Sequence, residues 1–220
     1  MTLGSGGVSR DDFYASPFGV AYSAYAERPW LNRLIARTVW GGDTRRYYES
    51  MSAIRGVADG GTIVDCPCGA GVALRQLDPG ENLRYVAVDL SPSMLRRARK
   101  RIDRRGLSRV ELIRADATEI PLPDGSANLF LSYWGLHCFP DPAAALVEAA
   151  RILKPGGRLV GSTFVRGRDS LRQRLIRPDV GDFGKPGTGE GVPRWLEAAG
   201  FSEPLIRRSG PMLFFDAQLA

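Results

Sequence analysis

The stretch Ile63–Val72 reads I-V-D-C-P-C-G-A-G-V, a short apolar run that ends in an acid and continues into a turn with two glycines. Eighteen residues after Gly71, a second apolar run, R-Y-V-A-V-D, ends in Asp89. A strand, a glycine turn, a helix-forming segment and a second strand predict a βαβ unit that binds a nucleotide-like cofactor. Because glycine has no side chain, the turn at Gly69 and Gly71 can bend sharply and lie directly against a ligand.

The acid at the end of the second run indicates which part of the cofactor lies beside it. A carboxylate at the carboxyl end of a strand can accept hydrogen bonds from both hydroxyls of a ribose. Asp89 is placed for this role. These two runs predict a cofactor that contains adenosine, without deciding which one.

Strand and helix patterns alternate from Thr62 onward, which predicts a parallel sheet with helices on both faces. Strands are expected at Thr62–Cys66, Arg84–Asp89, Val110–Ala115, Ala127–Ser132 and Arg158–Phe164. Helices are expected at Val72–Leu77, Pro92–Arg104, Pro142–Leu153 and Pro193–Ala199. Lys154-Pro155-Gly156-Gly157 is expected to be the turn into the fifth strand.

The end of the chain departs from this alternation. Two strand-like runs, Phe201–Arg207 and Met212–Asp216, are separated by Ser209-Gly210-Pro211 with no helix between them. A connection this short joins only antiparallel neighbours. The predicted fold class is therefore α/β, a Rossmann-like doubly wound sheet that is mostly parallel and ends in an antiparallel C-terminal hairpin strand.

The chain has 220 residues, 44% of them hydrophobic, which suits one α/β domain with its own core. Residues 1–58 are expected to hold a leader and an N-terminal helical extension that covers the core, with breaks near Pro29 and at Gly41-Gly42. Residues 59–220 are expected to form the core itself, with a substrate-side insert at about 166–193.

Cysteine and histidine counts argue against two other classes of site. Cys66, Cys68 and Cys138 make an odd number of cysteines, unlike the disulfide framework of a small secreted protein. The pair Cys66 and Cys68 with the single histidine of the chain makes only three ligands, which cannot complete a four-ligand zinc site, so no metal is expected.

No run approaches the roughly 18 apolar residues of a membrane helix, and no charged-then-apolar segment starts the chain. The predicted location is cytoplasmic. The net charge of +6 would suit an anionic partner, but the basic residues are mostly arginines interleaved with acids. A basic balance alone is a weak sign of nucleic-acid binding, so a small-molecule partner is favoured.

Five motifs follow one another in an order that is typical of one family. They are I-V-D-C-P-C-G-A-G, V-A-V-D-L-S-P-S-M-L, R-A-D-A-T-E-I-P-L-P-D-G-S-A-N-L-F, G-L-H-C-F-P-D-P and R-I-L-K-P-G-G-R-L. On these motifs the chain resembles the class I S-adenosylmethionine-dependent methyltransferases, in particular the small-molecule group that includes the quinone C-methyltransferases. The resemblance covers about Thr62 to Asp216. It implies S-adenosyl-L-methionine as the methyl donor and S-adenosyl-L-homocysteine as the product.

The resemblance also implies roles for residues of the first two motifs. Asp65 matches the acid that organises the cofactor turn. Cys68, Gly69 and Gly71 match the backbone that lies along the methionine portion of the cofactor. Leu90 matches the residue that flanks the adenine, next to the ribose ligand.

Two later pairs complete the implied cofactor site. Asp116 and Ala117 match the pair that reads the adenine edge, in which the carboxylate accepts from the exocyclic amine and the next N–H donates to a ring nitrogen. Ser132 and Tyr133 match the strand end that approaches the methionine portion. Pro67 stands where the family usually has glycine, and a turn that does not need a positive φ there tolerates it.

A nicotinamide-binding site is the main alternative for the cofactor. Such a site favours G-x-G-x-x-G, but counting from Gly69 the last position is Leu74. Asp89 fits either cofactor, whereas the pair Asp116-Ala117 and the terminal hairpin fit only the methyl donor. The sequence therefore favours a methyltransferase.

Four residues are candidates for the acceptor side of the site. His137 lies just beyond the fourth expected strand, where its imidazole could act as a general base or could instead cap or pack the following loop. Trp134 could line the acceptor pocket or fill space under the N-terminal helices. Tyr14 and Tyr22 could cover the cofactor or fill the core of amphipathic helices.

The predicted function is methyl transfer from S-adenosylmethionine to a small, lipophilic or aromatic metabolite, by proximity and desolvation with at most one general base. One alternative is an RNA or protein methyltransferase. Against it, the fourth strand ends in S-Y-W-G and not in the Asn/Asp-Pro-Pro-aromatic arrangement that holds a base amine. The other alternative is a cofactor-binding protein without catalytic activity.

Overall fold

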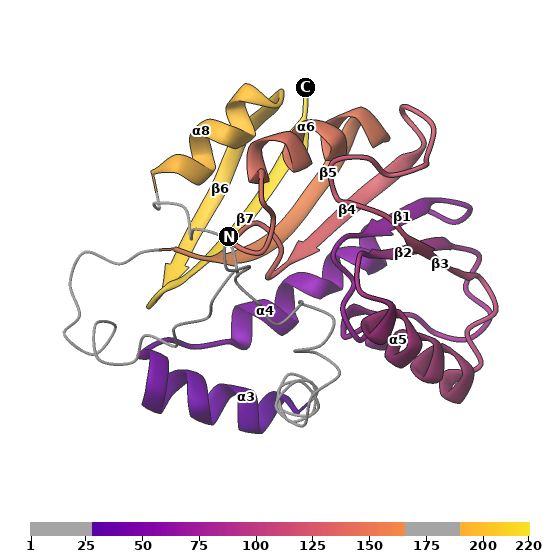
Figure 1. Ribbon diagram of the computed structural model, residues 1–220, viewed down its shortest axis with the longest axis horizontal. Coiled ribbons are helices and arrows are strands. Elements are labelled where there is room, and N and C mark those ends of the chain that lie inside the picture. Colours follow the sequence, from indigo (N-terminus) through magenta and orange to yellow (C-terminus); the bar gives the residue numbers. More distant parts are fainter. Residues whose placement is uncertain (1–27, 166–189) are drawn as a thin grey trace, which may run out of the picture.

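In the computed structural model, which describes residues 28–165 and 190–220, seven strands form one sheet in the order β3-β2-β1-β4-β5-β7-β6 (Figure 1). The strands are β1 (Thr62–Asp65), β2 (Arg84–Asp89), β3 (Val110–Arg114), β4 (Ala127–Tyr133), β5 (Leu153–Phe164), β6 (Phe201–Ser209) and β7 (Met212–Leu219). Strands β1 to β5 pair in parallel, and β7 runs antiparallel to both β5 and β6. The predicted mostly parallel sheet with an antiparallel hairpin is confirmed.

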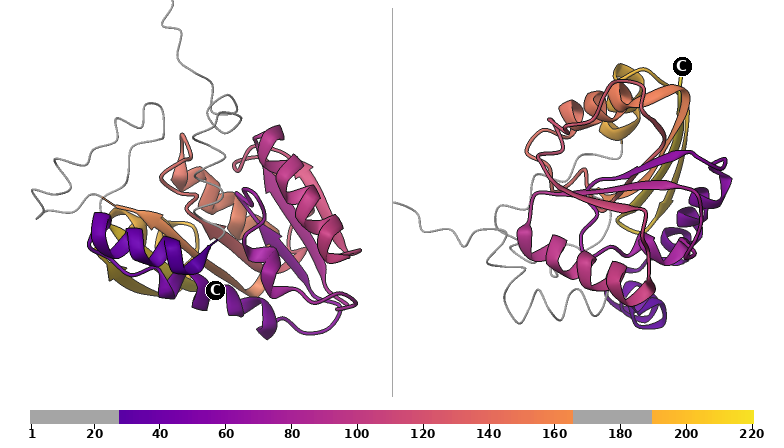
Figure 2. Two further views of the ribbon diagram at one scale, coloured as in Figure 1. Left: turned by 90° about the horizontal axis from the view of Figure 1, so that it is seen from below. Right: turned by 90° about the vertical axis from the view of Figure 1, so that its right-hand side faces the viewer.

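The central strands read as nearly continuous apolar runs because both of their faces are buried. Side chains alternate between the faces along a strand, so Ile63 and Val64 of β1 belong to two different core clusters. Val64 packs in the cluster that contains α6 (Pro142–Ile152) and α8 (Gly191–Ala198). Ile63 packs in the cluster that contains α4 (Arg45–Ser50) and α5 (Pro92–Arg105). The right-hand view of Figure 2 shows α5 on one side of the strands and α6 with α8 on the other.

The two longest helices begin at the caps that their sequences provide. Ser91 accepts a hydrogen bond from the N–H of Met94 and precedes Pro92 at the start of α5. Asp141 accepts a hydrogen bond from the N–H of Ala144 and precedes Pro142, the first residue of α6. Proline suits these first positions because its missing N–H has no partner in the helix there.

Two expected elements differ from the structure. The segment expected as a helix at Val72–Leu77 is a 3-10 turn, η3 (Ala73–Gln76). The chain is already extended at Leu77, whose carbonyl accepts a hydrogen bond from the guanidinium of Arg105 in α5 at 2.6 Å instead of from a following helical turn. In the fifth strand, β5 begins at Leu153, and the four residues expected as a turn, 154–157, bulge opposite the single residue Asn128.

The segment before β1 is helical and lies against the C-terminal hairpin. Helix α3 (Pro29–Ile35) continues into a π-helical turn, η1 (Ala36–Trp40), which ends at Gly41 with a φ of 64°. The N–H of Asp43 then donates to Oγ of Ser209 at 2.7 Å. Helix α4 and the 3-10 turn η2 (Met51–Gly56) lead on to β1. The expected break at Gly41-Gly42 is present, and α3 begins at Pro29.

Within the two described ranges, no helix is both long enough and apolar enough to cross a membrane. The same ranges contain no group of three or more histidine, cysteine or acidic residues that could hold a metal ion.

Candidate cofactor-binding site

The turn after β1 is held from both sides by neighbouring strands. The N–H of Cys66 donates to the carbonyl of Leu131 in β4 at 2.9 Å, and the N–H of Cys68 donates to the carbonyl of Val88 in β2 at 2.8 Å. Gly69 and Gly71 have φ angles of 53° and 76°, which glycine adopts without strain. The turn therefore has a defined position at the carboxyl edge of the sheet.

Asp89 lies at the end of β2, is 8% exposed and contacts this turn directly. One oxygen, Oδ2, accepts the N–H of Gly69 at 2.8 Å, and Oδ1 accepts the N–H of Ser91 at 2.9 Å. A carboxylate has about four acceptor positions, so this type of side chain can bind ribose hydroxyls as well as backbone N–H groups. The two backbone bonds orient the carboxylate between the glycine turn and the start of α5.

Asp65 is the acid beneath the turn, and it is 2% exposed. The phenolic O–H of Tyr85 donates to its Oδ2 at 2.7 Å. Burial raises the pKa of Asp65 from its ordinary 3.8 to about 7, although the Tyr85 bond lowers it, and the charge of Asp89 adds to the rise. Asp65 is therefore a buried structural acid that titrates near neutral pH.

This raised pKa predicts a pH-dependent role for Tyr85. The folded chain holds the Asp65 proton more tightly than the unfolded chain, so its contribution to stability is present below pH 4 and is lost as pH rises to about 7. Above pH 7 the carboxylate is charged, and its bond from Tyr85 contributes about 1.5–3 kcal/mol. Tyr85→Phe should therefore reduce the free energy of unfolding more at pH 8 than at pH 5, measured by urea denaturation. In an Asp65→Asn background this difference between the two pH values should vanish.

The second acidic position follows β3, the neighbour of β2. Asp116 is half-buried, and its Oδ1 accepts the N–H of Thr118 at 2.9 Å and the Thr118 hydroxyl at 2.8 Å. Ala117 is 7% exposed, and Leu90 is 52% exposed. Because β2 and β3 are adjacent and parallel, these residues lie at the same sheet edge as Asp89.

Ser132 and Tyr133 end β4 and point to opposite faces, as alternation along a strand requires. The Ser132 hydroxyl is buried without a hydrogen-bond partner among the described residues. A Cβ added at Gly135 would lie 2.5 Å from that oxygen and 2.6 Å from Cδ of Pro67, so the hydroxyl is close to the cofactor turn. Tyr133 instead packs edge-on against Tyr47 of α4, with ring centroids 5.4 Å apart.

Trp134 follows directly and has a φ of 56°, which is uncommon for a residue with a bulky side chain. Its ring stacks on Phe164 at the end of β5, with centroids 4.6 Å apart and planes at 21°. Tyr47 lies on another side of it at 5.2 Å. Unusual backbone of this kind gathers at functional sites, where surrounding contacts maintain it. The half-buried Trp134 ring thus forms part of an aromatic wall beside the ends of β4 and β5.

His137 is fixed to the end of β5 through one ring nitrogen. Its Nδ1 accepts the N–H of Phe164 at 3.3 Å and lies 3.1 Å from Oγ1 of Thr163, which also accepts the His137 N–H at 3.1 Å. With Nδ1 as an acceptor, the neutral ring carries its proton on Nε2. The imidazole therefore joins the loop after β4 to β5.

Sequence reasoning missed Thr163, Phe164 and Tyr47. The first two end β5, and β5 is the parallel neighbour of β4, so their places follow once the strand order is known. Of the other candidates, Tyr14 and Tyr22 lie outside the described residues, as does most of the expected insert, residues 166–189.

The assembled residues fit an adenosine cofactor that carries a methionine portion. A Cβ added at Gly69 would meet no described atom within 4 Å, so none of the described residues fills the space beside this glycine. The carboxylate of Asp89 is oriented beside this turn, and the nearby Ser132 hydroxyl has no hydrogen-bond partner among the described residues. Leu74, at the position of the third glycine of a nicotinamide motif, is fully buried.

Comparisons with known proteins agree with this fit. Residues 64–161 match the family model described as a methyltransferase domain. A demethylmenaquinone methyltransferase from Clavibacter sepedonicus is 30% identical over 184 residues, which cover 74% of each chain. An uncharacterised methyltransferase of Arabidopsis thaliana, described as chloroplastic, is 35% identical over 55% of this chain, but the match spans only 36% of that protein's length.

Solved structures share the fold at lower identity. Phosphoethanolamine N-methyltransferase 2 of Haemonchus contortus, in complex with S-adenosyl-L-methionine, superposes with a TM-score of 0.76 at 17% identity and covers 97% of this chain and 60% of its own. A SAM-dependent methyltransferase from Aquifex aeolicus gives a TM-score of 0.61 at 22% identity, over 80% of this chain and 93% of its own. The chain belongs to the class I S-adenosylmethionine-dependent methyltransferases.

Proposed function

We propose that this chain transfers a methyl group from S-adenosylmethionine to a small, lipophilic or aromatic metabolite. The observation that carries the proposal is the bond between Oδ2 of Asp89 and the N–H of Gly69 at 2.8 Å. It holds a carboxylate suited to a ribose directly beside a turn suited to a methionine portion.

The proposed holding residues follow the edge of the sheet. Asp89 would accept the ribose hydroxyls, and Asp116 with the N–H of Ala117 would read the adenine. The backbone of Cys68–Gly71 and the Ser132 hydroxyl would lie along the methionine portion. When bound, S-adenosylmethionine supplies a methyl group on a sulfonium, which is already activated for displacement. The task of the protein is then to align an acceptor and to exclude water.

The aromatic wall supports the proposed acceptor class. Trp134 and Phe164 are stacked at the ends of two adjacent strands, and Tyr47 covers Trp134 from α4. Aromatic rings suit a planar or lipophilic acceptor and also keep water from the site. The name of the Clavibacter relative, a demethylmenaquinone methyltransferase, points to the same class. The cytoplasmic location stays a prediction from the sequence.

His137 is proposed to hold this wall in place and not to remove a proton. Its Nδ1 lone pair is already directed at the N–H of Phe164. His137→Gln, whose amide oxygen can accept the same N–H, should therefore lower kcat less than about tenfold, whereas loss of a general base costs about 10²- to 10⁴-fold. The measurement is kcat from pH 6 to 9 with an acceptor identified among small phenols and quinones. A loss above about a hundredfold, together with disappearance of the acidic limb of the pH profile, would assign the base role to His137.

The experiment that tests the function is calorimetric titration of the full chain with S-adenosylmethionine, S-adenosylhomocysteine and NADH. We expect both sulfur ligands to bind and NADH not to bind. An acceptor screen then follows with small phenols and quinones first, and with RNA as a comparison. Absence of binding by both sulfur ligands would reject the proposal, and transfer to RNA alone would reject the acceptor class.

A further inference from the structure

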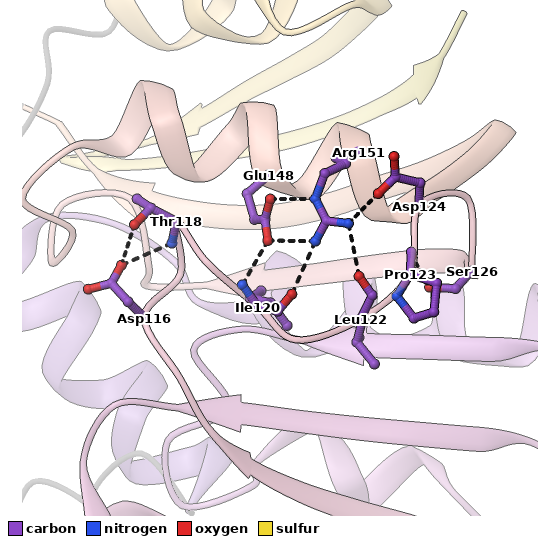
Figure 3. A network of polar contacts seen from close by, with 9 residues as sticks. All are labelled: Asp116, Thr118, Ile120, Leu122, Pro123, Asp124, Ser126, Glu148 and Arg151. Carbon is purple, nitrogen blue, oxygen red and sulfur yellow. Dashed lines mark hydrogen bonds and ion pairs between the residues drawn. The ribbon is translucent and has the colours of Figure 1, made fainter.

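A dense polar network joins α6 to the loop between β3 and β4 (Figure 3). The guanidinium of Arg151 donates from Nε and Nη2 to the two carboxylate oxygens of Glu148, at 2.7 Å and 2.8 Å. It also donates to the carbonyls of Leu122 and Ile120, at 2.9 Å and 3.1 Å, and to the carboxylate of Asp124. One side chain on α6 thus binds three successive points of a loop about 30 residues earlier in the chain.

Glu148, also on α6, binds the same loop. Its Oε1 accepts the N–H of Ile120 at 2.7 Å, so both backbone polar groups of Ile120 are bound to this ion pair. The Glu148 side chain is 10% exposed and that of Arg151 is 33% exposed, so solvent screens the pair only in part. Charged hydrogen bonds of this kind are shorter and stronger than neutral ones. Ile120 is therefore the firmly anchored point of the loop.

The anchored loop carries the two residues proposed to read the adenine. Asp116 and Ala117 lie between the last register pair of β3, Arg114 with Asp89, and the anchor at Ile120. The intervening turn is closed by the bonds from Thr118 to Asp116 and by the bond from the Glu119 N–H to the Asp116 carbonyl at 3.1 Å. The sheet fixes one end of this segment and Ile120 fixes the other. The positions of Asp116 and Ala117 therefore depend on both attachments.

We propose that Arg151 and Glu148 are positioning residues for adenine recognition: by anchoring Ile120 they set where the Asp116 carboxylate and the Ala117 N–H meet the base. This inference rests on the proposed function, because it takes S-adenosylmethionine as the ligand and these two residues as its adenine contacts. Neither Arg151 nor Glu148 touches the cofactor in this scheme. They act through the backbone of the loop.

The chemistry of the base provides a selective readout. Adenine presents an exocyclic amine, a donor, beside a ring nitrogen that accepts. Hypoxanthine presents a carbonyl beside a ring N–H, so both polarities are reversed. An Asp116 carboxylate and an Ala117 N–H in the right place therefore favour S-adenosylhomocysteine over S-inosylhomocysteine, and a misplaced loop loses that preference.

The experiment is titration of the full chain with these two homocysteine ligands, for the unchanged protein and for Arg151→Lys. Lysine keeps the charge but cannot form the two-pronged bond to Glu148 while also reaching the loop carbonyls. We expect Arg151→Lys to weaken the binding of S-adenosylhomocysteine about ten- to a hundredfold, a loss comparable to that of a charged hydrogen bond. The affinity for S-inosylhomocysteine should change less than about threefold. The preference for adenine should therefore collapse.

Arg158→Lys is the matched control. Arg158 of β5 makes a comparable two-pronged bond, to Asp216 of β7, and has no hydrogen bond to the loop among the described residues. Its substitution should leave the adenine preference unchanged. Glu148→Gln is the second variant: its amide oxygen can still accept the Ile120 N–H, so it should fold even where Arg151→Lys does not, and it should lower the preference in the same direction.

The outcomes distinguish a failure of the positioning role from a failure of the proposed function. Equal weakening of both ligands in Arg151→Lys and Glu148→Gln would mean that the network only stabilises the fold, which overturns the inference. An unchanged protein that binds both ligands equally would also overturn it, because Asp116 and Ala117 would then not read the base, although the proposed function would stand. An unchanged protein that binds neither ligand would reject the proposed function, and with it the inference.

Discussion

Replacement of Asp89 by alanine is expected to weaken binding of S-adenosylmethionine at least about a hundredfold, since two charged hydrogen bonds contribute roughly 3 kcal/mol or more together. The substitution removes the proposed acceptor of the ribose hydroxyls. It also releases the N–H groups of Gly69 and Ser91, which orient the glycine turn and the start of α5 in the structure. The measurement is calorimetric titration with S-adenosylmethionine and S-adenosylhomocysteine.

The control for Asp89→Ala is Asp103→Ala. Asp103 is an exposed acid on α5, so its removal changes the net charge by the same amount without touching the sheet edge. The affinity of the Asp103→Ala variant for both ligands should stay within about twofold of that of the unchanged protein, because surface charges interact weakly in water. Unchanged affinity in a folded Asp89→Ala variant would reject the assignment of the cofactor site.

The largest effect on stability is expected from Gly161→Ala, in the middle of β5. A Cβ added there would lie 2.2 Å from the carbonyl oxygen of Ser132 and 2.4 Å from the ring of Phe215. One of these neighbours is backbone in an adjacent strand, so the sheet itself would have to move. We expect a loss of about 3 kcal/mol, the upper part of the range for overpacked cores. For a chain of this size such a loss corresponds to a decrease in Tm of about 6–12 °C.

Gly56→Ala is the matched control for that substitution. Gly56 ends η2, does not have a positive φ, and an added Cβ would meet no described atom within 4 Å. The Gly56→Ala substitution should change the free energy of unfolding of the protein by less than about 1 kcal/mol, in either direction. Thermal and urea unfolding of the two variants give the comparison. Equal effects would show that β5 accommodates a side chain at Gly161.

The strands and the main helices could be predicted from the sequence because their signals are local. The apolar run R-Y-V-A-V-D predicts β2 over the same residues, Arg84–Asp89, since both faces of that strand are buried. Ser91 and Pro92 mark the start of α5 for a similar reason, because a cap satisfies N–H groups only a few residues away. The C-terminal hairpin follows from the shortness of its turn.

The errors concern segments whose conformation depends on distant partners. Residues 154–157 have the composition of a turn, yet they continue β5 as a bulge because β4 lies beside them. The segment Val72–Leu77 has helical composition, but Leu77 accepts a hydrogen bond from Arg105 of α5 after only one short 3-10 turn. The secondary-structure propensities of neighbouring residues cannot predict either contact.

The candidate site divides in the same way. Its glycine turn and its acids at strand ends follow from local sequence, because a sharp turn needs Gly69 and Gly71 whatever surrounds them. Tertiary structure alone decides that Asp89 binds the Gly69 N–H, that Ser132 faces the turn while Tyr133 faces α4, and that His137 directs Nδ1 at β5. These contacts join residues about 20 or more positions apart, so they depend on strand order and packing, which the pattern of neighbouring residues does not encode.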